Sequence, residues 1–499
     1  MATSSKRPAA GPGRRSAAST LLKTVPQTAG FTAKRENLVE KVGAAGAAAS
    51  VGAAARAADR LHLWHPFTAM DRWGREEATV IVGGEGFELI DAEGRRYLDG
   101  FSSLWCNLFG HRVAAIDAAV RSQLGRIAHT TQLGLANDVT AQLASRLCGL
   151  APRGLTRAFF SDSGSEAVEV ALKMAYQYWR IQPGVSARRR NLFLRLGEAY
   201  HGDTLGSVSV GGIGLFHATY RDLVFKTVEL PAPHALRRGT GQSRTAFARQ
   251  WRAAAAALFQ RVGSRLAAVV VEPCVQGAAG MIVHPPGTLR FLADLARQHG
   301  TLLICDEVAT GFARTGKLFA VEHESVRPDF LCVAKGLTGG YLPVSATLST
   351  ESIFNAFADR GAVFYHGHTY SGNPLGCAAA LATLDLIERR HLVRHVQEMA
   401  PFFKRSLAPL SRHPHVAEVR LKGLMGCIEL TQDRRTLQPF PVEARVSARV
   451  CQVCRREGVM LRPLGDTVPL MPIPAMGRRE LKRIAEVVIA AVVEVTGQR

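Results

Sequence analysis

Lys335 is the residue of this chain best suited to nucleophilic chemistry. It follows an apolar run, Leu-Cys-Val-Ala at residues 331–334, and precedes a glycine-rich loop. An exposed lysine, with a pKa near ~10.4, stays protonated, whereas apolar surroundings lower that pKa and free the amine to attack a carbonyl carbon. A lysine so placed can form a Schiff base. Taken alone, the stretch is also typical of a solvent-exposed lysine that ends an edge strand.

Three further stretches place polar groups directly after apolar runs. Residues 161–166, Ser-Asp-Ser-Gly-Ser-Glu, combine hydroxyls and a glycine at the start of an expected helix, which suits a phosphate group but also an ordinary helix cap. Tyr200 could cover the face of a planar ring or pack in the core. Asp306 could keep a pyridine nitrogen protonated, or serve as a cap or a metal ligand.

The lysine and the three polar stretches together indicate one cofactor. A phosphate cradle, a ring-stacking aromatic, a carboxylate for a pyridinium nitrogen and a lysine nucleophile are the groups that pyridoxal 5'-phosphate requires. Each is a weak signal alone, but they occur in order along one chain. Their joint occurrence favours a pyridoxal-phosphate enzyme.

The elements that must position these groups are short apolar strands alternating with helices. Helices are expected at residues 166–179 and 289–298, among others, and one at residues 116–124 with Ile116, Val120 and Leu124 on one face. The alternation predicts an α/β fold with a mostly parallel central sheet covered by helices on both faces, whose ligands sit at the carboxyl ends of the strands. The strands expected in this sheet are residues 158–160, 192–194, 267–271, 302–305 and 330–334.

The chain divides into four expected segments. Residues 1–60 form a basic Ala/Gly-rich leader that we expect to be disordered, because it holds too little apolar surface to offset its ordering entropy. Residues 61–100, with an antiparallel pattern, are expected to begin a smaller α+β domain. Residues 101–375 are the large cofactor-binding domain, and residues 376–499 supply a linking helix and the rest of the small domain.

Composition narrows the class of protein. The net charge of +21 could indicate nucleic-acid binding, but the basic residues are dispersed without a reader motif, so we expect no nucleic-acid partner. No run is long and apolar enough to span a membrane. Nine scattered cysteines indicate reduced thiols in a cytoplasmic protein, while the basic leader leaves open an organellar transit peptide or a bacterial extension.

A family resemblance rests on specific blocks of sequence. Residues 306–316, Asp-Glu-Val-Ala-Thr-Gly-Phe-Ala-Arg-Thr-Gly, followed by Lys335-Gly336, resemble the signature of the class III aminotransferases, which are fold type I pyridoxal-phosphate transferases. The chain from about residue 61 onward also resembles the biotin-biosynthesis branch of that family. The blocks that carry this closer resemblance are Trp-His-Pro-Phe-Thr at 64–68, Asp-Ser-Gly-Ser at 162–165, Tyr-His-Gly-Asp-Thr at 200–204, Gln-Gly at 276–277, His-Gly-His-Thr at 366–369 and Arg-Pro at 462–463.

The resemblance implies a role for each matching residue. Lys335 would hold the cofactor and move protons, with Asp306 on the pyridinium and Tyr200 on the ring. The phosphate would be bound by Gly164 and Ser165, joined by His368 and Thr369 of the partner subunit in a homodimer. The substrate pocket would be formed by Phe67, Leu104, Trp105, Tyr200, Arg314, Lys335, Gly367 and Arg462, with Arg462 on the carboxylate of 8-amino-7-oxononanoate.

The implied reaction transfers an amino group from S-adenosylmethionine to 8-amino-7-oxononanoate, giving 7,8-diaminononanoate. Phe67 and Leu104 depart from a tyrosine and a tryptophan common in adenosylmethionine-using members, so lysine stays open as the donor. Another class III ω-amino acid aminotransferase, or an aminomutase, is an alternative. No metal is expected, since Cys451 and Cys454 lack a second ligand pair and His65, His111, His201 and His366 lack ligand spacing.

Overall fold

The structure is a computed structural model that describes residues 44–75 and 78–497. These residues form two compact units. One comprises residues 44–75 and 78–82 with 91–94, and the other comprises residues 83–90 with 95–497. Most of the predicted disordered leader, residues 1–43, lies outside the described residues.

The first unit corrects the predicted start of ordered structure. Helix α2 spans Ala44–His62, so the disorder expected up to residue 60 is wrong for its last part. Alanine has the highest helix propensity, and α2 is built largely from it. Helix α3 (Met70–Trp73) follows, and the Asp59 carboxylate of α2 accepts hydrogen bonds from His65 Nε2 at 2.8 Å and Trp73 Nε1 at 2.6 Å.

The second unit is built on a seven-stranded sheet with the order β4-β12-β11-β10-β7-β5-β6. Neighbouring strands pair in parallel except at β12, which is antiparallel to both β11 and β4. The predicted, mostly parallel sheet is therefore confirmed. Its strands are β4 (Leu155–Ser161), β5 (Leu192–Leu196), β6 (Val228–Leu230), β7 (Leu266–Val271), β10 (Leu302–Asp306), β11 (Phe330–Val333) and β12 (Ser345–Thr350).

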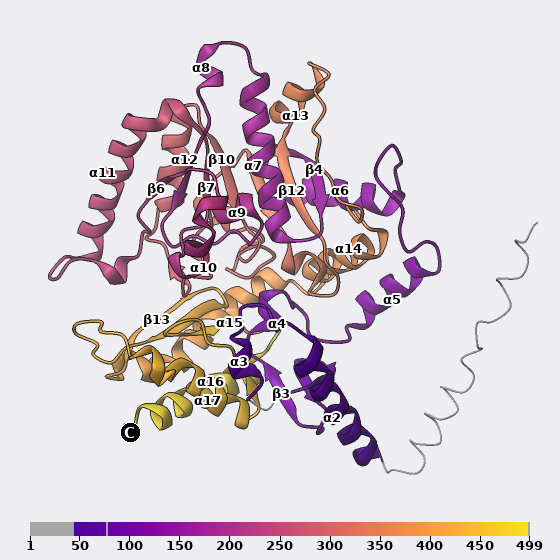
Figure 1. The fold of residues 1–499 in the computed structure, drawn as a ribbon, viewed down its shortest axis with the longest axis vertical. Helices are drawn as coiled ribbons and strands as arrows, with labels where there is room; N and C mark the ends of the chain where they lie inside the picture. Colours follow the sequence, from indigo (N-terminus) through magenta and orange to yellow (C-terminus); the bar gives the residue numbers. More distant parts are fainter. Residues whose placement is uncertain (1–43, 76–77, 498–499) are drawn as a thin grey trace, which may run out of the picture. The chain divides into compact units, whose positions relative to one another are not determined.

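Side chains of the central strands alternate between two separate cores, as the period of two in a strand requires. On β7, Val269 and Val271 join the larger core, while Ala268 and Val270 join the smaller one. Helix α7 (Gly164–Ile181) covers the smaller core, and α11 (Arg244–Val262), α12 (Thr288–Gln298) and α14 (Pro374–Arg389) contribute to the larger one (Figure 1). Both faces of the sheet are therefore buried, which explains its nearly continuous apolar strands.

The second unit contains further helices. On α5, Ile116 is fully buried, but Leu124 is 59% exposed, so the predicted common face is not fully buried. Eight residues along a helix amount to about 80° of rotation, which carries Leu124 off the buried face. The helices are α4 (Ser102–Trp105), α5 (Ala114–Leu124), α6 (Asp138–Leu150), α8 (Val185–Arg188), α9 (Leu205–Ser209), α10 (Gly214–His217) and α13 (Glu351–Ala358).

The carboxyl-terminal part of the second unit carries an antiparallel sheet, β13 (Val416–Lys422), β14 (Met425–Leu430) and β16 (Thr467–Leu470). Helices α15 (Leu392–Ser406), α16 (Val446–Arg456) and α17 (Arg478–Thr496) accompany it. Strand β15 (Val459–Met460) pairs in parallel with β3 (Arg96–Asp99), which itself pairs with β2 (Glu88–Asp91) beside β1 (Ile81–Glu85). The α/β fold class is confirmed, while the predicted domain boundaries stay a prediction.

The cysteines agree with reduced thiols. All nine are free, and seven are buried. Cys451 and Cys454 lie on α16 and pack in the larger core. Within residues 44–75 and 78–497, no helix combines the length and hydropathy that crossing a membrane would require.

The packing of α12 against the sheet leads to a test of the fold. Leu292 is fully buried in the larger core, whereas Leu215 on α10 is 86% exposed. We expect Leu292→Ala to lower the free energy of unfolding by roughly 2–5 kcal/mol, because it removes buried methyl groups and leaves a cavity. Leu215→Ala, the matched control, should change it by less than about 0.5 kcal/mol. Urea denaturation of both variants measures the difference, and equal effects would contradict this assignment of the core.

Candidate active site

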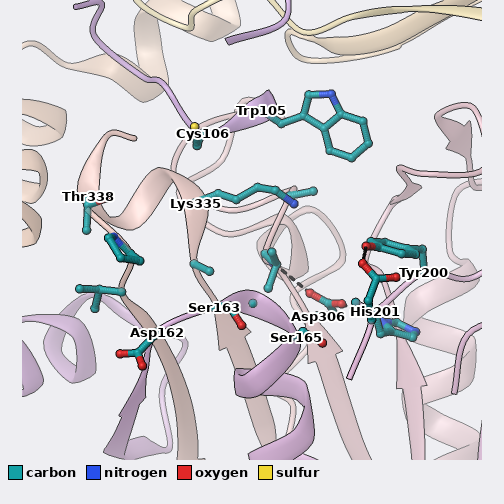
Figure 2. Close-up of a pocket in the computed structure, with 18 of the residues that line it drawn as sticks. Trp105, Cys106, Asp162, Ser163, Ser165, Tyr200, His201, Asp306, Lys335 and Thr338 are labelled. Carbon is teal, nitrogen blue, oxygen red and sulfur yellow. Dashed lines mark hydrogen bonds and ion pairs between the residues drawn. The ribbon is translucent and has the colours of Figure 1, made fainter. Parts of the chain in front are cut away.

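A cavity of about 680 Å³ lies where the parallel strands of the large sheet end. Five strands each deliver at least one polar side chain to its wall, at or just beyond their carboxyl ends (Figure 2). Strand β12 runs the other way, and residues before its amino end close the same cavity. The polar groups, taken in strand order along the chain, are Asp162 and Ser163 after β4, Tyr200 after β5, Glu272 after β7, Asp306 on β10 and Lys335 after β11.

Lys335 stands at the end of β11 with a left-handed backbone, φ +44°. Its side chain extends across the cavity beneath the Trp105 ring, and Nζ lies 5.2 Å from the ring centroid (Figure 2). Burial lowers the pKa of the Lys335 ammonium, although the nearby carboxylates Asp306 and Glu272 oppose that shift. The environment therefore makes the neutral, nucleophilic amine more accessible than it would be in water.

Asp306 is a buried carboxylate held from two sides. Its Oδ2 lies 2.7 Å from His201 Nδ1, and its Oδ1 accepts the backbone N–H of Val308 at 3.0 Å. His201 is itself buried. These two contacts fix the orientation of the Asp306 carboxylate at the floor of the cavity. The expectation that His201 packs or makes hydrogen bonds agrees with this contact.

The start of α7 forms a cradle with little spare room. Ser163 caps the helix, and Glu166 completes a capping box by accepting the Ser163 N–H. A Cβ on Gly164 would lie 2.5 Å from Val308, and one on Gly202 would lie 2.3 Å from Ser165. Only glycine fits these two positions, which leaves backbone N–H groups at the helix start accessible to an anion.

Tyr200 lies on the opposite wall and is fixed in place. Its hydroxyl donates a hydrogen bond to Asp203 at 2.6 Å, and its ring meets Phe216 edge to face at 6.0 Å. Burial and the Asp203 hydrogen bond raise the pKa of the Tyr200 phenol, so the ring stays neutral. A neutral, immobilised aromatic wall suits a planar ligand.

Glu272 is a site residue that the sequence analysis missed. Its two carboxylate oxygens accept the backbone N–H groups of Tyr200, at 3.1 Å, and Gly277, at 2.8 Å. It thereby ties two walls of the cavity together. A signal was present, because Glu272 directly follows the apolar strand β7, just as Asp306 ends β10.

Trp105 belongs to a turn with an unusual backbone. Residues Ser102, Ser103, Leu104 and Trp105 all have positive φ, between 47° and 72°. Such a conformation costs roughly 1–2 kcal/mol for each residue that has a Cβ. The predicted pocket residue Trp105 lines the cavity, whereas its neighbour Leu104 is 47% exposed and does not.

Arg314 lies behind this wall rather than in the cavity. It is 1% exposed, and its guanidinium donates to the carbonyl oxygens of Pro472 at 2.6 Å and of Trp105 and Asn107 at 3.3 Å. Burial lowers the pKa of Arg314 to about 10. Its donors are used by the protein, so it shapes the site through the backbone that it binds.

The predicted residues Gly367, His368, Thr369 and Arg462 of the second unit are not among those that line the cavity. Phe67 is part of the first unit, and Arg462 is exposed just after β15. Gly367, His368 and Thr369 lie between α13 and α14. The cavity therefore brings together the five residues predicted to bind the cofactor, Lys335, Asp306, Tyr200, Gly164 and Ser165.

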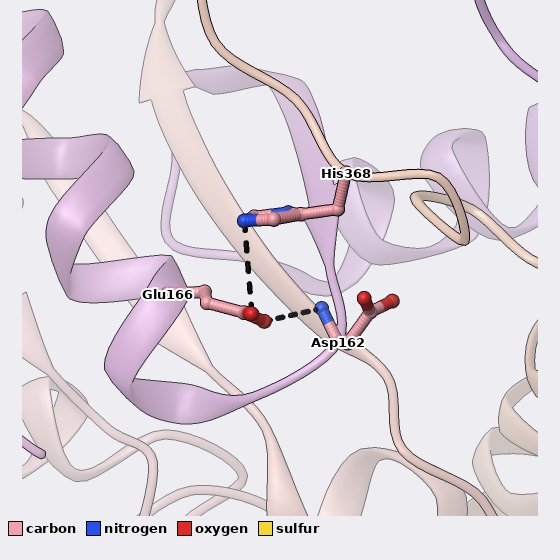
Figure 3. A group of neighbouring side chains, drawn as sticks. All are labelled: Asp162, Glu166 and His368. Carbon is pink, nitrogen blue, oxygen red and sulfur yellow. Dashed lines mark hydrogen bonds and ion pairs between the residues drawn. The ribbon is translucent and has the colours of Figure 1, made fainter. Parts of the chain in front are cut away.

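His368 meets two carboxylates near the start of α7. One carboxylate oxygen each of Asp162 and Glu166 and one imidazole nitrogen of His368 lie within 4.8 Å of one another. His368 Nε2 is 3.6 Å from Glu166 Oε1 (Figure 3). The other Glu166 oxygen accepts the backbone N–H groups of Asp162 and Ser163. Burial and the neighbouring Glu166 raise the pKa of Asp162. Glu166 thus serves mainly to cap the helix.

The cavity fits pyridoxal phosphate. The glycine-lined start of α7 offers N–H groups to a phosphate, Tyr200 offers a ring face, and Asp306 offers a buried negative charge to a ring nitrogen. Lys335 reaches into the space between them. Each demand of the cofactor is met by a side chain or backbone group already in place.

Glu272 gives a pH test of the site. Burial raises its pKa from 4.5 to about 7. The folded state therefore binds the Glu272 proton more tightly than the unfolded state does. The stabilisation of the folded state by this proton is complete below about pH 4.5 and is lost as the pH rises through 7. Relative to Glu272→Gln, the cofactor-free wild type should lose up to roughly 3 kcal/mol of unfolding free energy over that range. Exposed Glu443→Gln is the control, and parallel curves for wild type and Glu272→Gln would contradict the prediction.

Comparisons with known proteins agree with the geometry. The sequence profile described as Aminotransferase class-III matches residues 69–492. The adenosylmethionine-8-amino-7-oxononanoate aminotransferase of Nitratidesulfovibrio vulgaris is 48% identical over 452 residues, covering 90% of this chain and 83% of that protein. The enzyme of the same name from Anoxybacillus flavithermus is 45% identical, covering 88% of this chain and 96% of that protein.

Solved structures share the fold over nearly their whole length. The crystal structure of adenosylmethionine-8-amino-7-oxononanoate aminotransferase from Methanocaldococcus jannaschii superposes with a TM-score of 0.83 at 37% identity, covering 88% of this chain and 98% of that one. An (S)-enantioselective ω-transaminase from Thermomicrobium roseum superposes with a TM-score of 0.85 at 35% identity, covering 89% of this chain and 98% of that one. The chain therefore belongs to the class III aminotransferases, which are pyridoxal-phosphate-dependent enzymes of fold type I.

Proposed function

We propose that this aminotransferase transfers an amino group to 8-amino-7-oxononanoate, giving 7,8-diaminononanoate in biotin biosynthesis, with S-adenosylmethionine as the donor. The observation that carries the proposal is the similarity to relatives named for this reaction, 48% and 45% identical over most of the chain. Overall fold discriminates less, because the ω-transaminase superposes as well as the enzyme from Methanocaldococcus jannaschii.

The described residues support the chemistry of amino transfer. Bound pyridoxal phosphate supplies an electron sink that stabilises negative charge at the carbon bearing the amino group. Asp306 holds a negative charge where the ring nitrogen would lie, and Lys335 provides an amine able to accept and return a proton. Trp105 and Tyr200 both line the cavity that contains Lys335.

The substrates are assigned by the family resemblance. Arg462 is exposed after β15, so its guanidinium is available to bind a carboxylate with two parallel hydrogen bonds. Phe67 and Leu104 replace a hydroxyl and an indole that adenosylmethionine-using members commonly carry. Lysine is therefore the alternative donor for the same acceptor. An aminomutase would keep both groups on one molecule and need no second substrate.

We further propose a cytoplasmic homodimer with shared active sites. His368 and Thr369 do not line the cavity of their own chain, which supports a role for them in the phosphate site of the partner. The nine free cysteines suit a reducing compartment. Dimers with twofold symmetry form two equivalent sites of this kind.

The function is tested by supplying 8-amino-7-oxononanoate with S-adenosylmethionine and measuring 7,8-diaminononanoate by mass spectrometry. We expect product with this donor, and the same assay with lysine tests the alternative. Lys335→Ala should lower the rate at least about a thousand-fold, because it removes the proton-transfer group. It should also abolish the visible absorbance of lysine-bound cofactor, whereas exposed Lys404→Ala should change neither.

Two results would contradict the proposal. Turnover of ω-amino acids with no diamine from either donor would assign the protein to another class III activity. A colourless protein that takes up no pyridoxal phosphate would contradict the cofactor itself. Borohydride reduction followed by peptide mapping locates the cofactor, and the expected attachment point is Lys335 Nζ.

Shared sites predict complementation between two inactive variants. Thr369→Asp should place a negative charge beside the phosphate of the partner, while Lys335→Ala disables its own site. Random mixing by co-expression makes half the dimers mixed, and each mixed dimer has one intact site, so about a quarter of wild-type activity should return. Differently tagged subunits allow the mixed dimer to be purified and assayed alone. Activity no higher than that of the separate variants would exclude a site shared through Thr369.

A further inference from the structure

The turn Ser102–Trp105 is the most strained segment next to the cavity. It bears the label α4 in Figure 1, but its φ angles are +53°, +47°, +71° and +72°, and none of the four residues is glycine. Consecutive left-handed residues with side chains persist only where the surroundings hold them. The groups that hold this turn are therefore part of the site.

Asp99 holds the middle of the turn. Its carboxylate is fully buried and accepts the Ser103 backbone N–H at 2.9 Å and the Ser103 hydroxyl at 2.7 Å. His111 Nε2 lies 3.2 Å from the same carboxylate. Hydrogen bonds to a charged acceptor are stronger than neutral ones, particularly in a buried place, so Asp99 can offset the strain.

The two ends of the turn are held by other groups. The Ser102 hydroxyl donates to the Met471 carbonyl oxygen, and Arg314 donates to the carbonyl oxygen of Trp105 at 3.3 Å. Neither contact reaches Ser103 or Leu104. In the interior of the turn, Cys106 Sγ donates to the Ser103 carbonyl oxygen at 3.1 Å, and Asp99 is the charged side chain that binds there.

The conformation of the turn decides where the Trp105 ring lies. Trp105 itself has positive φ, which sets the direction of its Cα–Cβ bond, and its ring covers Lys335 Nζ at 5.2 Å from the centroid. A right-handed backbone at residues 102–105 would point the indole elsewhere. The strained turn therefore links Asp99 to the wall above the reactive amine, as Figure 2 shows for Trp105 and Lys335.

We propose that Asp99 is a positioning residue that keeps the Ser102–Trp105 turn left-handed and thereby holds the Trp105 ring over Lys335. The proposal rests on the proposed role of Lys335 as the cofactor-binding lysine. Asp99 does not line the cavity and acts only through the turn. Misplacing a wall of the site in this way lowers the rate without removing a reacting group.

The test uses Asp99→Asn in the cofactor-loaded enzyme. Asparagine keeps the size but loses the charge and one acceptor oxygen, so kcat/KM should fall about ten- to a hundred-fold. The visible circular dichroism of the bound cofactor should also change, since it reports the geometry of the surrounding wall. Asp294→Asn, a partly exposed carboxylate on α12, is the matched control and should stay within about twofold.

Strain relief distinguishes positioning from a general loss of stability. Glycine adopts positive φ without a steric cost, so adding Ser103→Gly to Asp99→Asn should restore kcat/KM several-fold and return the dichroism toward that of the wild type. A general defect in folding would not be repaired by a more flexible residue. The proposal is overturned if Asp99→Asn behaves like Asp294→Asn, or if Ser103→Gly fails to improve it.

If Asp99→Asn does not fold, a second pair of variants tests the positioning role of Asp99. Ser103→Ala and Ser103→Gly both lose the hydroxyl bonded to Asp99, but only glycine relieves the strain. We expect the glycine variant to be several-fold more active, and equal or reversed activities would overturn the proposal. If Lys335 does not hold the cofactor, the wild type itself lacks the visible signal, so the two failures are distinguishable.

Discussion

Parallel strands must all end at the same edge of their sheet, and this constraint organises the whole molecule. Polar groups separated by up to 173 residues along the chain, from Asp162 to Lys335, meet in one cavity because β4 and β11 run the same way. The helices that return the chain also bury both faces of the sheet. The site is therefore a consequence of the fold topology, and each strand contributes one part of it.

Burial then sets the chemistry of those groups. The cavity brings Lys335, His201, Asp306 and Glu272 close together, where each charge affects the others more than it would in water. Asp306 keeps its partners His201 and Val308, whereas burial raises the pKa of Glu272 to about 7 and lowers that of Lys335. Two acidic groups in one site thus differ in role because they differ in partners.

Much of this could be predicted from the sequence, for identifiable reasons. Lys335, Asp306 and Tyr200 follow short apolar runs, and the alternation of such runs with helical stretches predicts the sheet and its covering helices. Antiparallel β12 and short β6 were not predicted, since neither has a distinctive neighbour in sequence. Glu272 follows the same strand-end pattern, so its place in the site agrees with that rule. The predicted disorder differs from the helix at Ala44–His62 because alanine-rich sequence lacks large apolar residues yet has high helix propensity.

The strained turn marks where prediction from residue types stops. Nothing in Ser-Ser-Leu-Trp indicates positive φ, which usually requires glycine or asparagine. The conformation arises from tertiary partners that lie before and far after the turn, Asp99 and Arg314 among them. The residues predicted to bind the cofactor can be found from the sequence, because they follow apolar runs that end at one edge of the parallel sheet. The wall formed by Trp105 is different, because its placement is decided by contacts that only the folded chain provides.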